Sequence, residues 1–553
     1  MRLIKSKTKI ALLVGLSLVF LLGLSSFKHH ENYFEIAKNL DIFATLYQEV
    51  NAYYVDDLNP TTVINQGIEA MLRSLDPYTN YIPEDRIEDY RTMTTGEYGG
   101  IGAGINNQDG RILITMPFEG FPAHKAGLKI GDQILAVDGV SLEDKNTEEV
   151  SQLLKGQSGT EVSLTIQRVG KDKPFVAKLK REKIHINNVT YSGMINEEVG
   201  MIRLTDFTNN ASKEVKNALL DLKSKGAKKI ILDLRGNPGG LLFEAINISN
   251  IFLPKGKEIV STRGKVEDWN KTYHALNPSV DEEIPLIVLI SGSSASASEI
   301  VAGAIQDYDR GIVIGENSFG KGLVQATRPL SFNAQLKVTV AKYYIPSGRC
   351  IQAIDYAHRD EDGNLTKVPD SLRVAFKTKN GRIVYDGGGI KPDIETTDED
   401  YPPILQSLLQ KGLIFEYANL FAAKNENISE PRAFKLSDTQ YEDFLRWVKG
   451  QDYNYTTSVE IALEEIEASA KDEGSWTAIQ AQVAALKKAV SHDKERDLKD
   501  FQAQIREELE REIATRYYLA RGATEASFDD DPDIRQALAV FADPQKFNRI
   551  LEK

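Results

Sequence analysis

The chain has 553 residues, of which 41% are apolar and 27% charged, a composition typical of globular proteins and not of disordered or low-complexity chains. This length exceeds what one hydrophobic core organises, so about three or four folding units are expected. The net charge of -13 at pH 7 argues against nucleic acid as a partner, because no basic stripe is present to displace counterions. A single cysteine, Cys350, excludes an internal disulfide.

The amino terminus has the charge order of an export signal. Four basic residues lead into an uncharged, mostly apolar run from Ile10 to Leu24. The run is short for a membrane-spanning helix and no clear Ala-x-Ala follows, so a cleaved signal and a retained anchor both stay open. Residues 1–27 are expected to be a signal peptide or membrane anchor and the protein's only membrane contact. We expect an exported protein, periplasmic or anchored to the outer face of the inner membrane.

Four further regions follow in chain order. Residues 39–95 carry apolar side chains at helical spacing, broken by a turn at Asp76-Pro77, which predicts a helical amino-terminal region. Residues 96–183 combine clustered glycines with short alternating strands, which indicates a compact domain. Residues 184–398 alternate strands with helices, the pattern of an α/β core. Residues 401–553 have few glycines and many helix-favouring residues, which predicts a helical carboxy-terminal extension.

Within the α/β core the pattern predicts individual elements. The expected strands are 199–204, 229–234, 285–290, 311–314 and 335–344, and the expected helices are 212–224, 241–251 and 296–306. In α/β folds, ligand groups gather where strands run into helices. The turns at the ends of these strands are therefore the places to search for a site.

The compact domain carries a specific set of short motifs. They are Ala-Gly-Leu at 126–128, Gly-Asp-x-Ile-Leu at 131–135 and Val-Asp-Gly at 137–139. With these motifs in this order, the segment resembles a PDZ domain of the bacterial protease type. The resemblance implies that backbone N–H groups of Gly100, Ile101 and Gly102 hold the terminal carboxylate of an extended peptide. The alternative is that the glycines only form a tight entry into a strand.

A candidate nucleophile lies between a predicted strand and a predicted helix. The small residues from Ser291 to Ser298 permit close backbone approach, and a serine there would be exposed at the helix amino terminus. The partial positive charge and the N–H donors of that terminus favour a nearby oxyanion. The alternative is structural, because Ser296 and Glu299 also have the spacing of a capping box.

Further stretches of the chain favour catalysis over capping. They are Gly315-Glu316-Asn317-Ser318-Phe319-Gly320-Lys321-Gly322-Leu323-Val324-Gln325, Leu232-Asp233-Leu234-Arg235-Gly236-Asn237-Pro238-Gly239-Gly240, Leu75-Asp76-Pro77-Tyr78 and Val384 to Ile394. Together with the serine segment they resemble the S41 family of C-terminal processing peptidases, over roughly residues 42–394. The resemblance implies a ClpP/crotonase-like α/β core with an inserted PDZ domain. It also implies a serine endopeptidase that cleaves exported proteins near their C-termini.

The same resemblance assigns roles to individual residues. Ser296 attacks the peptide carbonyl, Lys321 is the general base, and Gln325 supports that lysine. The backbone N–H of Ala297 and one from the Pro-Gly-Gly turn, assigned to Gly239, form the oxyanion hole. No metal and no organic cofactor is expected. Burial of a lysine disfavours its ammonium, which is how such a base is prepared.

Other interpretations of the same residues are less favoured. Residues 315–321 also spell a phosphate-loop pattern, but Gly322 stands where Ser or Thr should meet magnesium, and the following residues are expected to be extended. No histidine lies in a motif that would complete a Ser-His-Asp triad. The acidic runs at 360–363 and 529–531 lack the full calcium loop and are expected to be a turn and a helix cap. A peptide-binding scaffold with a lapsed peptidase site is the non-enzymatic alternative. Adaptors or further copies of the chain could bind the helical extension, whose role carries no motif.

Overall fold

The structure is a computed structural model, and it describes residues 33–359, 365–397, 401–490 and 494–552. The chain divides into two compact units, one made of residues 1–82 and 327–338 and the other of residues 83–326 and 339–553. The predicted signal or anchor at 1–27 and the predicted turn at 360–363 lie outside the described residues. Among the helices of the described residues, none is both long enough and apolar enough to cross a bilayer.

The first unit is mostly helical. Residues 33–53 are helical, and α2 (Pro60–Arg73) follows, with Asn59 accepting the Thr62 N–H at its amino terminus. The predicted turn at Asp76 is confirmed, because its carboxylate accepts the N–H groups of Tyr78 and Thr79, each at 2.8 Å. Strand β1 (Asn80–Ile82) then pairs antiparallel with residues 335–337.

The second unit begins with α3 (Ile87–Thr95) and a small β domain. Strand β2 (Glu97–Gly100) pairs antiparallel with β9 (Glu182–His185), so the chain enters and leaves this domain through one two-stranded ribbon. The sheet between them contains β3 (Ala103–Gln108), β4 (Arg111–Pro117), β5 (Gln133–Val137), β6 (Val140–Ser141), β7 (Glu161–Gln167) and β8 (Phe175–Lys180). Its helices are α4 (Pro122–Lys125) and α5 (Thr147–Leu154), and its buried core includes Ile114, Val150 and Leu164.

The centre of the second unit is a six-stranded sheet. Its strand order is β10-β11-β12-β15-β16-β23, with β10 antiparallel and all the other neighbours parallel. The strands are β10 (Val189–Met194), β11 (Val199–Leu204), β12 (Lys229–Asp233), β15 (Leu286–Ile290), β16 (Ile312–Gly315) and β23 (Ile394–Glu395). The connecting helices are α6 (Ala211–Ser224), α7 (Leu242–Phe252) and α8 (Ala297–Asp307). These bounds lie within one or two residues of the predicted ones.

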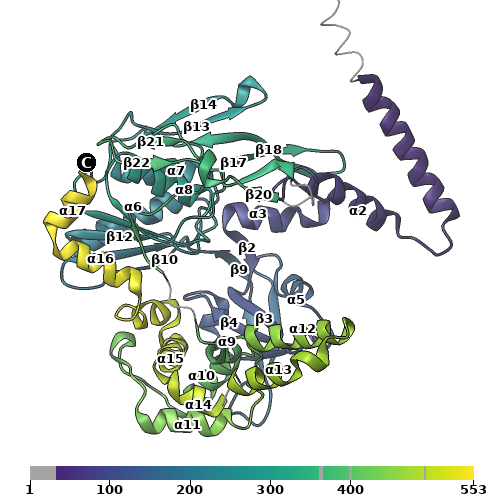
Figure 1. The fold of residues 1–553 in the computed structure, drawn as a ribbon, viewed down its shortest axis with the longest axis vertical. Coiled ribbons are helices and arrows are strands. Elements are labelled where there is room, and N and C mark those ends of the chain that lie inside the picture. The colour runs from purple at the N-terminus through teal and green to yellow at the C-terminus, as the bar shows by residue number, and fades with distance from the viewer. Residues whose placement is uncertain (1–32, 360–364, 398–400, 491–493, 553) are drawn as a thin grey trace, which may run out of the picture. The chain divides into compact units, whose positions relative to one another are not determined.

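Both faces of this sheet are buried. Along β12 and β15, side chains alternate between two hydrophobic clusters, as the two-residue repeat of a strand requires. The first cluster contains the apolar faces of α6, α7 and α8. The second contains Phe528 and the apolar side chains of α16 (Pro532–Ala542), and α17 (Pro544–Leu551) packs at its edge. Figure 1 shows α16 and α17, in yellow, beside the strands of this sheet.

The remaining strands extend around the core. They are β13 (Glu258–Gly264), β14 (Lys271–His274), β17 (Leu323–Pro329), β18 (Gln335–Tyr344), β19 (Ile354–Arg359), β20 (Leu365–Lys367), β21 (Ala375–Lys377) and β22 (Ile383–Tyr385). Strand β13 pairs with residues 341–344 of β18, and β19–β20 and β21–β22 are short antiparallel pairs.

The carboxy-terminal region is helical, as predicted. It comprises α9 (Pro403–Gln410), α10 (Leu413–Lys424), α11 (Asp438–Val448), α12 (Ser458–Asp472), α13 (Trp476–Val490), α14 (Lys494–Asp500) and α15 (Gln502–Ala526), ahead of α16 and α17. Leu405, Phe444 and Leu509 are fully buried in a core of their own. Within α15 the backbone breaks at Leu519, which has a φ of 52°.

Candidate active site

Ser296 is held in a strained backbone conformation between β15 and α8. It is the N-cap residue of α8, yet its φ of 55° and ψ of -110° differ from the extended values of an ordinary cap. A non-glycine residue pays for such a conformation with local strain, and residues of this kind cluster at functional sites. A serine at a sharp strand-to-helix turn presents its hydroxyl outward, as nucleophiles in hydrolases do. Ser296 therefore has the backbone strain that is typical of functional residues, and its catalytic role stays a prediction.

Glu299 joins the serine segment to the lysine segment. Its carboxylate is completely buried and accepts the N–H of Ser296 at 2.8 Å and the N–H of Lys321 at 2.9 Å, both on Oε2. Oε1 accepts the N–H of Gly320 at 2.7 Å and the hydroxyl of Ser318 at 2.5 Å. Burial raises the pKa of Glu299, and the hydrogen bond from Ser318 opposes this rise. One side chain thus fixes the backbone of both candidate catalytic residues.

A tyrosine hydroxyl makes the same connection from the other side. Tyr343 is 1% exposed, and its hydroxyl lies 3.1 Å from the carbonyl oxygen of Ser296 and 2.6 Å from that of Lys321. Both carbonyls are therefore within hydrogen-bond reach of one atom. Glu299 and Tyr343 together hold the two segments close and in register.

The glycine-rich stretch at 387–390 supports the lysine loop. The N–H of Ile390 donates to the Ser318 hydroxyl oxygen at 2.6 Å, and that hydroxyl in turn donates to Glu299. A Cβ on Gly389 would lie 2.6 Å from the carbonyl oxygen of Ser318, so only glycine fits there. A hydrogen-bonded chain therefore runs from residue 390 to the backbone of the candidate nucleophile.

The Pro-Gly-Gly turn lies directly against the serine. Asn237 is fully buried, and its carbonyl oxygen accepts the N–H of Ala295 at 3.0 Å and the hydroxyl of Ser298 at 2.9 Å. A Cβ on Gly239 would lie 2.8 Å from Cβ of Ser296 and 2.8 Å from the nitrogen of Ala297. The turn predicted to approach the nucleophile does so.

The two predicted oxyanion donors differ in their surroundings. Ala297 is the first residue of α8, where a backbone N–H has no acceptor within the helix. The N–H of Gly239 instead donates to the side-chain oxygen of Asn237 at 2.9 Å. To bind an oxyanion, Gly239 would have to exchange this local bond for the substrate oxygen.

Lys321 lies two residues before β17 and Gln325 is the third residue of that strand, and both are half-buried. The amide nitrogen of Gln325 donates to the hydroxyl of Thr339 at 3.1 Å, on the adjacent strand β18. This bond fixes the Gln325 side chain. Its support of Lys321 stays a prediction.

The PDZ loop residues are tightly packed. The carbonyl oxygen of Ile101 accepts the N–H of Ala123, and that of Gly102 accepts the N–H of Phe118, each at 2.8 Å. Gly102 has a φ of 71°, and a Cβ there would lie 2.5 Å from Cβ of Phe121. Gly100 ends β2, opposite Glu182. The loop is thus a tight strand entry, and its carboxylate binding stays a prediction.

Two of the competing motifs can be compared with the structure. Residues 323–329 form a strand, not the helix that a phosphate loop requires. Asp531 caps α16, accepting the N–H of Ile534 at 3.0 Å. In the part of the chain that the structure describes, no group of three or more His, Cys, Asp or Glu residues could hold a metal ion.

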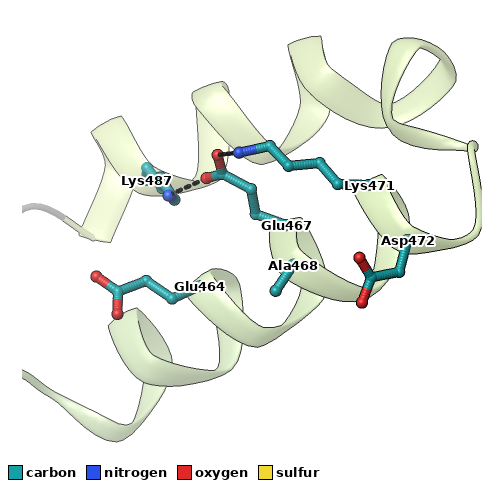
Figure 2. Close-up of a pocket in the computed structure, with 6 residues that line it drawn as sticks. All are labelled: Glu464, Glu467, Ala468, Lys471, Asp472 and Lys487. Atoms are coloured by element: carbon teal, nitrogen blue, oxygen red, sulfur yellow. Dashed lines mark hydrogen bonds and ion pairs between the residues drawn. The ribbon is translucent and has the colours of Figure 1, made fainter.

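A recess on the carboxy-terminal helices lies apart from this chemistry. Figure 2 shows it between α12 and α13, where Glu467 pairs with Lys471 at 2.6 Å and with Lys487 at 2.5 Å. Hydrogen bonds from these two lysines lower the pKa of Glu467 to about 2. Neither Ser296 nor Lys321 lines the recess.

Sequence reasoning missed three residues that organise the site. Glu299 was read only as half of a capping box, whereas it also holds the lysine loop. Asn237 lies in the motif at 232–240, but the sequence analysis assigned it no role. The feature that could have indicated one is an amide side chain between Arg235-Gly236 and Pro238. Tyr343 lies in a predicted strand, and nothing in the local sequence distinguishes it.

Comparisons with known proteins agree with this layout of a nucleophilic hydrolase. Three family models match the chain: "Peptidase family S41" at residues 198–358, "PDZ domain" at 118–168 and "Probable PDZ-protease, C-terminal helical domain" at 404–541. The carboxy-terminal-processing protease of Bartonella bacilliformis is 40% identical over 321 residues, covering 57% of this chain and 73% of the relative. A "Probable CtpA-like serine protease" of Staphylococcus aureus is 35% identical over 402 residues, covering 70% and 79%.

Among solved structures, the PDZ domain of a carboxy-terminal protease from Vibrio cholerae is 33% identical. It covers 16% of this chain and 99% of that domain, with a TM-score of 0.16. The chain belongs to peptidase family S41 and is a serine protease. The α/β core, the PDZ domain and the helical carboxy-terminal region are thereby confirmed.

Proposed function

We propose that the protein is an endopeptidase that cleaves exported proteins near their C-termini with a Ser296/Lys321 dyad. The observation that carries the proposal is the buried Glu299 carboxylate, which binds the backbone of both residues at once. Such an arrangement fixes a nucleophile and a base in relation to each other before substrate arrives.

The chemistry follows from these positions. Lys321, in its neutral form, takes the proton of the Ser296 hydroxyl as the oxygen attacks the scissile carbonyl carbon. The oxyanion that forms accepts hydrogen bonds from Ala297 and from the turn at 236–240, at the amino terminus of α8. The Lys321 ammonium then gives its proton to the leaving amine, and the peptide C–N bond breaks. Water, deprotonated by Lys321, hydrolyses the acyl-serine and restores the hydroxyl.

The PDZ domain supplies recognition of the substrate tail. An extended peptide would add as a strand beside β3, in front of α5, with its carboxylate at Gly100, Ile101 and Gly102. The proposal places the protein outside the cytoplasm, either periplasmic or anchored to the outer face of the inner membrane. This location is proposed from the charge order of the first 27 residues.

The test is cleavage of a reporter peptide with an apolar, free C-terminus by the wild type and by Ser296→Ala and Lys321→Ala. Both variants should fold and lose turnover, because one lacks the nucleophile and the other its base. Gln325→Ala should be slowed less. Near-normal turnover in either dyad variant would refute the assignment, and an inactive wild type that binds the peptide would favour the lapsed scaffold.

Recognition of the tail is tested with the same reporter carrying a C-terminal amide. The amide removes the carboxylate that the glycine loop would hold, so processing at low concentration should weaken. Equal cleavage of the free and amidated peptides would show that residues 100–102 are only a strand entry.

A further inference from the structure

The central sheet depends on the carboxy-terminal segment for its second face. Ile231, Ile287 and Ile314, on three adjacent strands, are fully buried in the cluster that includes Phe528, Ile534 and Val540. Residues on alternate positions of the same strands face α6, α7 and α8 instead. The cover over the second face comes from residues more than 130 positions beyond the last strand of the sheet, which ends at Glu395. Residues 528–551 thus belong to the catalytic core in space.

Three carboxylates surround the side chain of Arg235, which follows β12. Its Nε and Nη2 each donate to Asp233 at 2.9 Å, in a bidentate pair. Its Nη1 lies 2.8 Å from Asp531 and 2.8 Å from Asp533, at the start of α16. Burial would raise the pKa of Asp233, but the Arg235 guanidinium outweighs it and the pKa lies below its usual value. The guanidinium is therefore held at both ends, by the strand and by the carboxy-terminal helix.

The backbone of Arg235 leads directly into the turn beside the nucleophile. Gly236 donates its N–H to Ser291 at 3.1 Å, and Asn237 accepts from Ala295. Gly239 then lies against Ser296. A shift of the Arg235 side chain would move the backbone at the start of this turn. Four residues later, the same turn places Gly239 against Ser296. Accurate placement of such groups decides catalytic rates.

We propose that Asp531 and Asp533 are positioning residues for peptide-bond cleavage, acting through Arg235 on the turn at 236–239. The carboxy-terminal segment is then part of the machinery that forms the oxyanion site, whatever else the helical extension binds. The inference rests on the proposed function, because it assumes that this turn serves the reaction at Ser296.

The test compares the full-length Asp531→Asn/Asp533→Asn variant with the wild type in reporter cleavage. Loss of a positioning contact should lower kcat by roughly 10- to 100-fold and leave KM nearly unchanged. Asp529→Asn is the matched control, because Asp529 carries an exposed ion pair to Arg432 and does not touch Arg235. Its kcat should equal that of the wild type.

A second control separates positioning from stability. Val540→Ala removes a fully buried side chain from the same segment without touching Arg235, and so lowers the melting temperature alone. If Val540→Ala loses as much kcat as the double asparagine variant at an equal loss of melting temperature, the role is only structural and the inference fails.

The last arm asks whether the effect passes through Arg235. In an Arg235→Gln background, the two asparagine substitutions should change kcat less than twofold, because the contact they would remove is already gone. If the two asparagine substitutions lower kcat by the same factor in the Arg235→Gln background as in the wild type, the inference is wrong. The proposed function fails separately, if Ser296→Ala cleaves as well as the wild type; the inference alone fails if Ser296→Ala is inactive while the double asparagine variant is fully active.

Discussion

Glu299→Gln is the perturbation that most directly probes how the site is held together. The carboxylate accepts two hydrogen bonds on each oxygen, from Ser296 and Lys321 on one and from Gly320 and Ser318 on the other. Glutamine keeps one of the two acceptor oxygens and replaces the other with an NH2 group. The two donors that bonded to the replaced oxygen then face another donor and lose their acceptor. A buried donor left without a partner costs about 1–3 kcal/mol, so the two cost roughly 2–6 kcal/mol together.

Part of this cost is offset, because the buried charge disappears with the substitution. We expect the free energy of unfolding to fall by roughly 2–4 kcal/mol. We also expect kcat/KM to fall on the order of 100-fold, since a displacement of about 1 Å between nucleophile and base has that effect. The assays are urea unfolding followed by circular dichroism, and reporter cleavage at several temperatures below the transition.

The control is Glu316→Gln, in the loop that carries Lys321. Glu316 is exposed and, among the residues that the structure describes, accepts only the N–H of Gly292, at 3.3 Å, so both measurements should stay at their wild-type values. If Glu299→Gln unfolds at the wild-type urea concentration and keeps kcat/KM within twofold, Glu299 does not join the two catalytic segments and the reasoning is wrong.

Three further predictions concern Tyr343, the titration of Glu299 and the PDZ domain. Tyr343→Phe removes the hydroxyl that reaches the carbonyls of Ser296 and Lys321, so kcat should fall roughly tenfold with unchanged KM, as steady-state kinetics would show; an unchanged kcat would mean that Glu299 alone suffices. Burial raises the pKa of Glu299, so the folded state binds its proton more tightly than the unfolded chain, where glutamate titrates near 4.5. The free energy of unfolding that Glu299 contributes is then fully present below pH 4.5 and is lost as the pH rises through the pKa of the folded state. Urea unfolding between about pH 4 and pH 8 should show this loss in the wild type and less of it in Glu299→Gln. The same pH dependence in both proteins would contradict the prediction. Finally, if the PDZ domain gates the site, a non-cleavable peptide ligand should activate cleavage of a reporter without a PDZ tail; replacing residues 101–181 by a short glycine linker, which the pairing of β2 with β9 allows, should leave basal cleavage equal or higher. A folded deletion that is inactive, together with a ligand that never stimulates, would make the domain a required part of the site.

The local sequence was sufficient for most elements of the core. Strands such as 199–204 and helices such as 211–224 are readable because burial on one or both faces imposes a repeat of 2 or 3.6 on the side chains. The candidate dyad was found through the resemblance of the segments around Ser296 and Lys321 to the S41 family, because the small residues around Ser296 are by themselves equally typical of a helix cap. The pairs near 354–385 were not predicted, because three of their four strands have only three residues, too few for a repeat to be seen.

The sequence by itself determined the family, the nucleophile and base candidates, and the order of the regions, since each is encoded in residues adjacent in the chain. Only the tertiary structure decided what holds those residues in place. The double role of Glu299 depends on a loop that lies some twenty residues further along, and the contacts of Tyr343 depend on the pairing of distant strands. The sequence predicted only a helical extension after the core. In the structure, its last two helices cover the second face of the sheet, and α16 binds Arg235. A hydrophobic repeat shows that a face is buried, but the partner that buries it is set by packing between segments far apart in sequence.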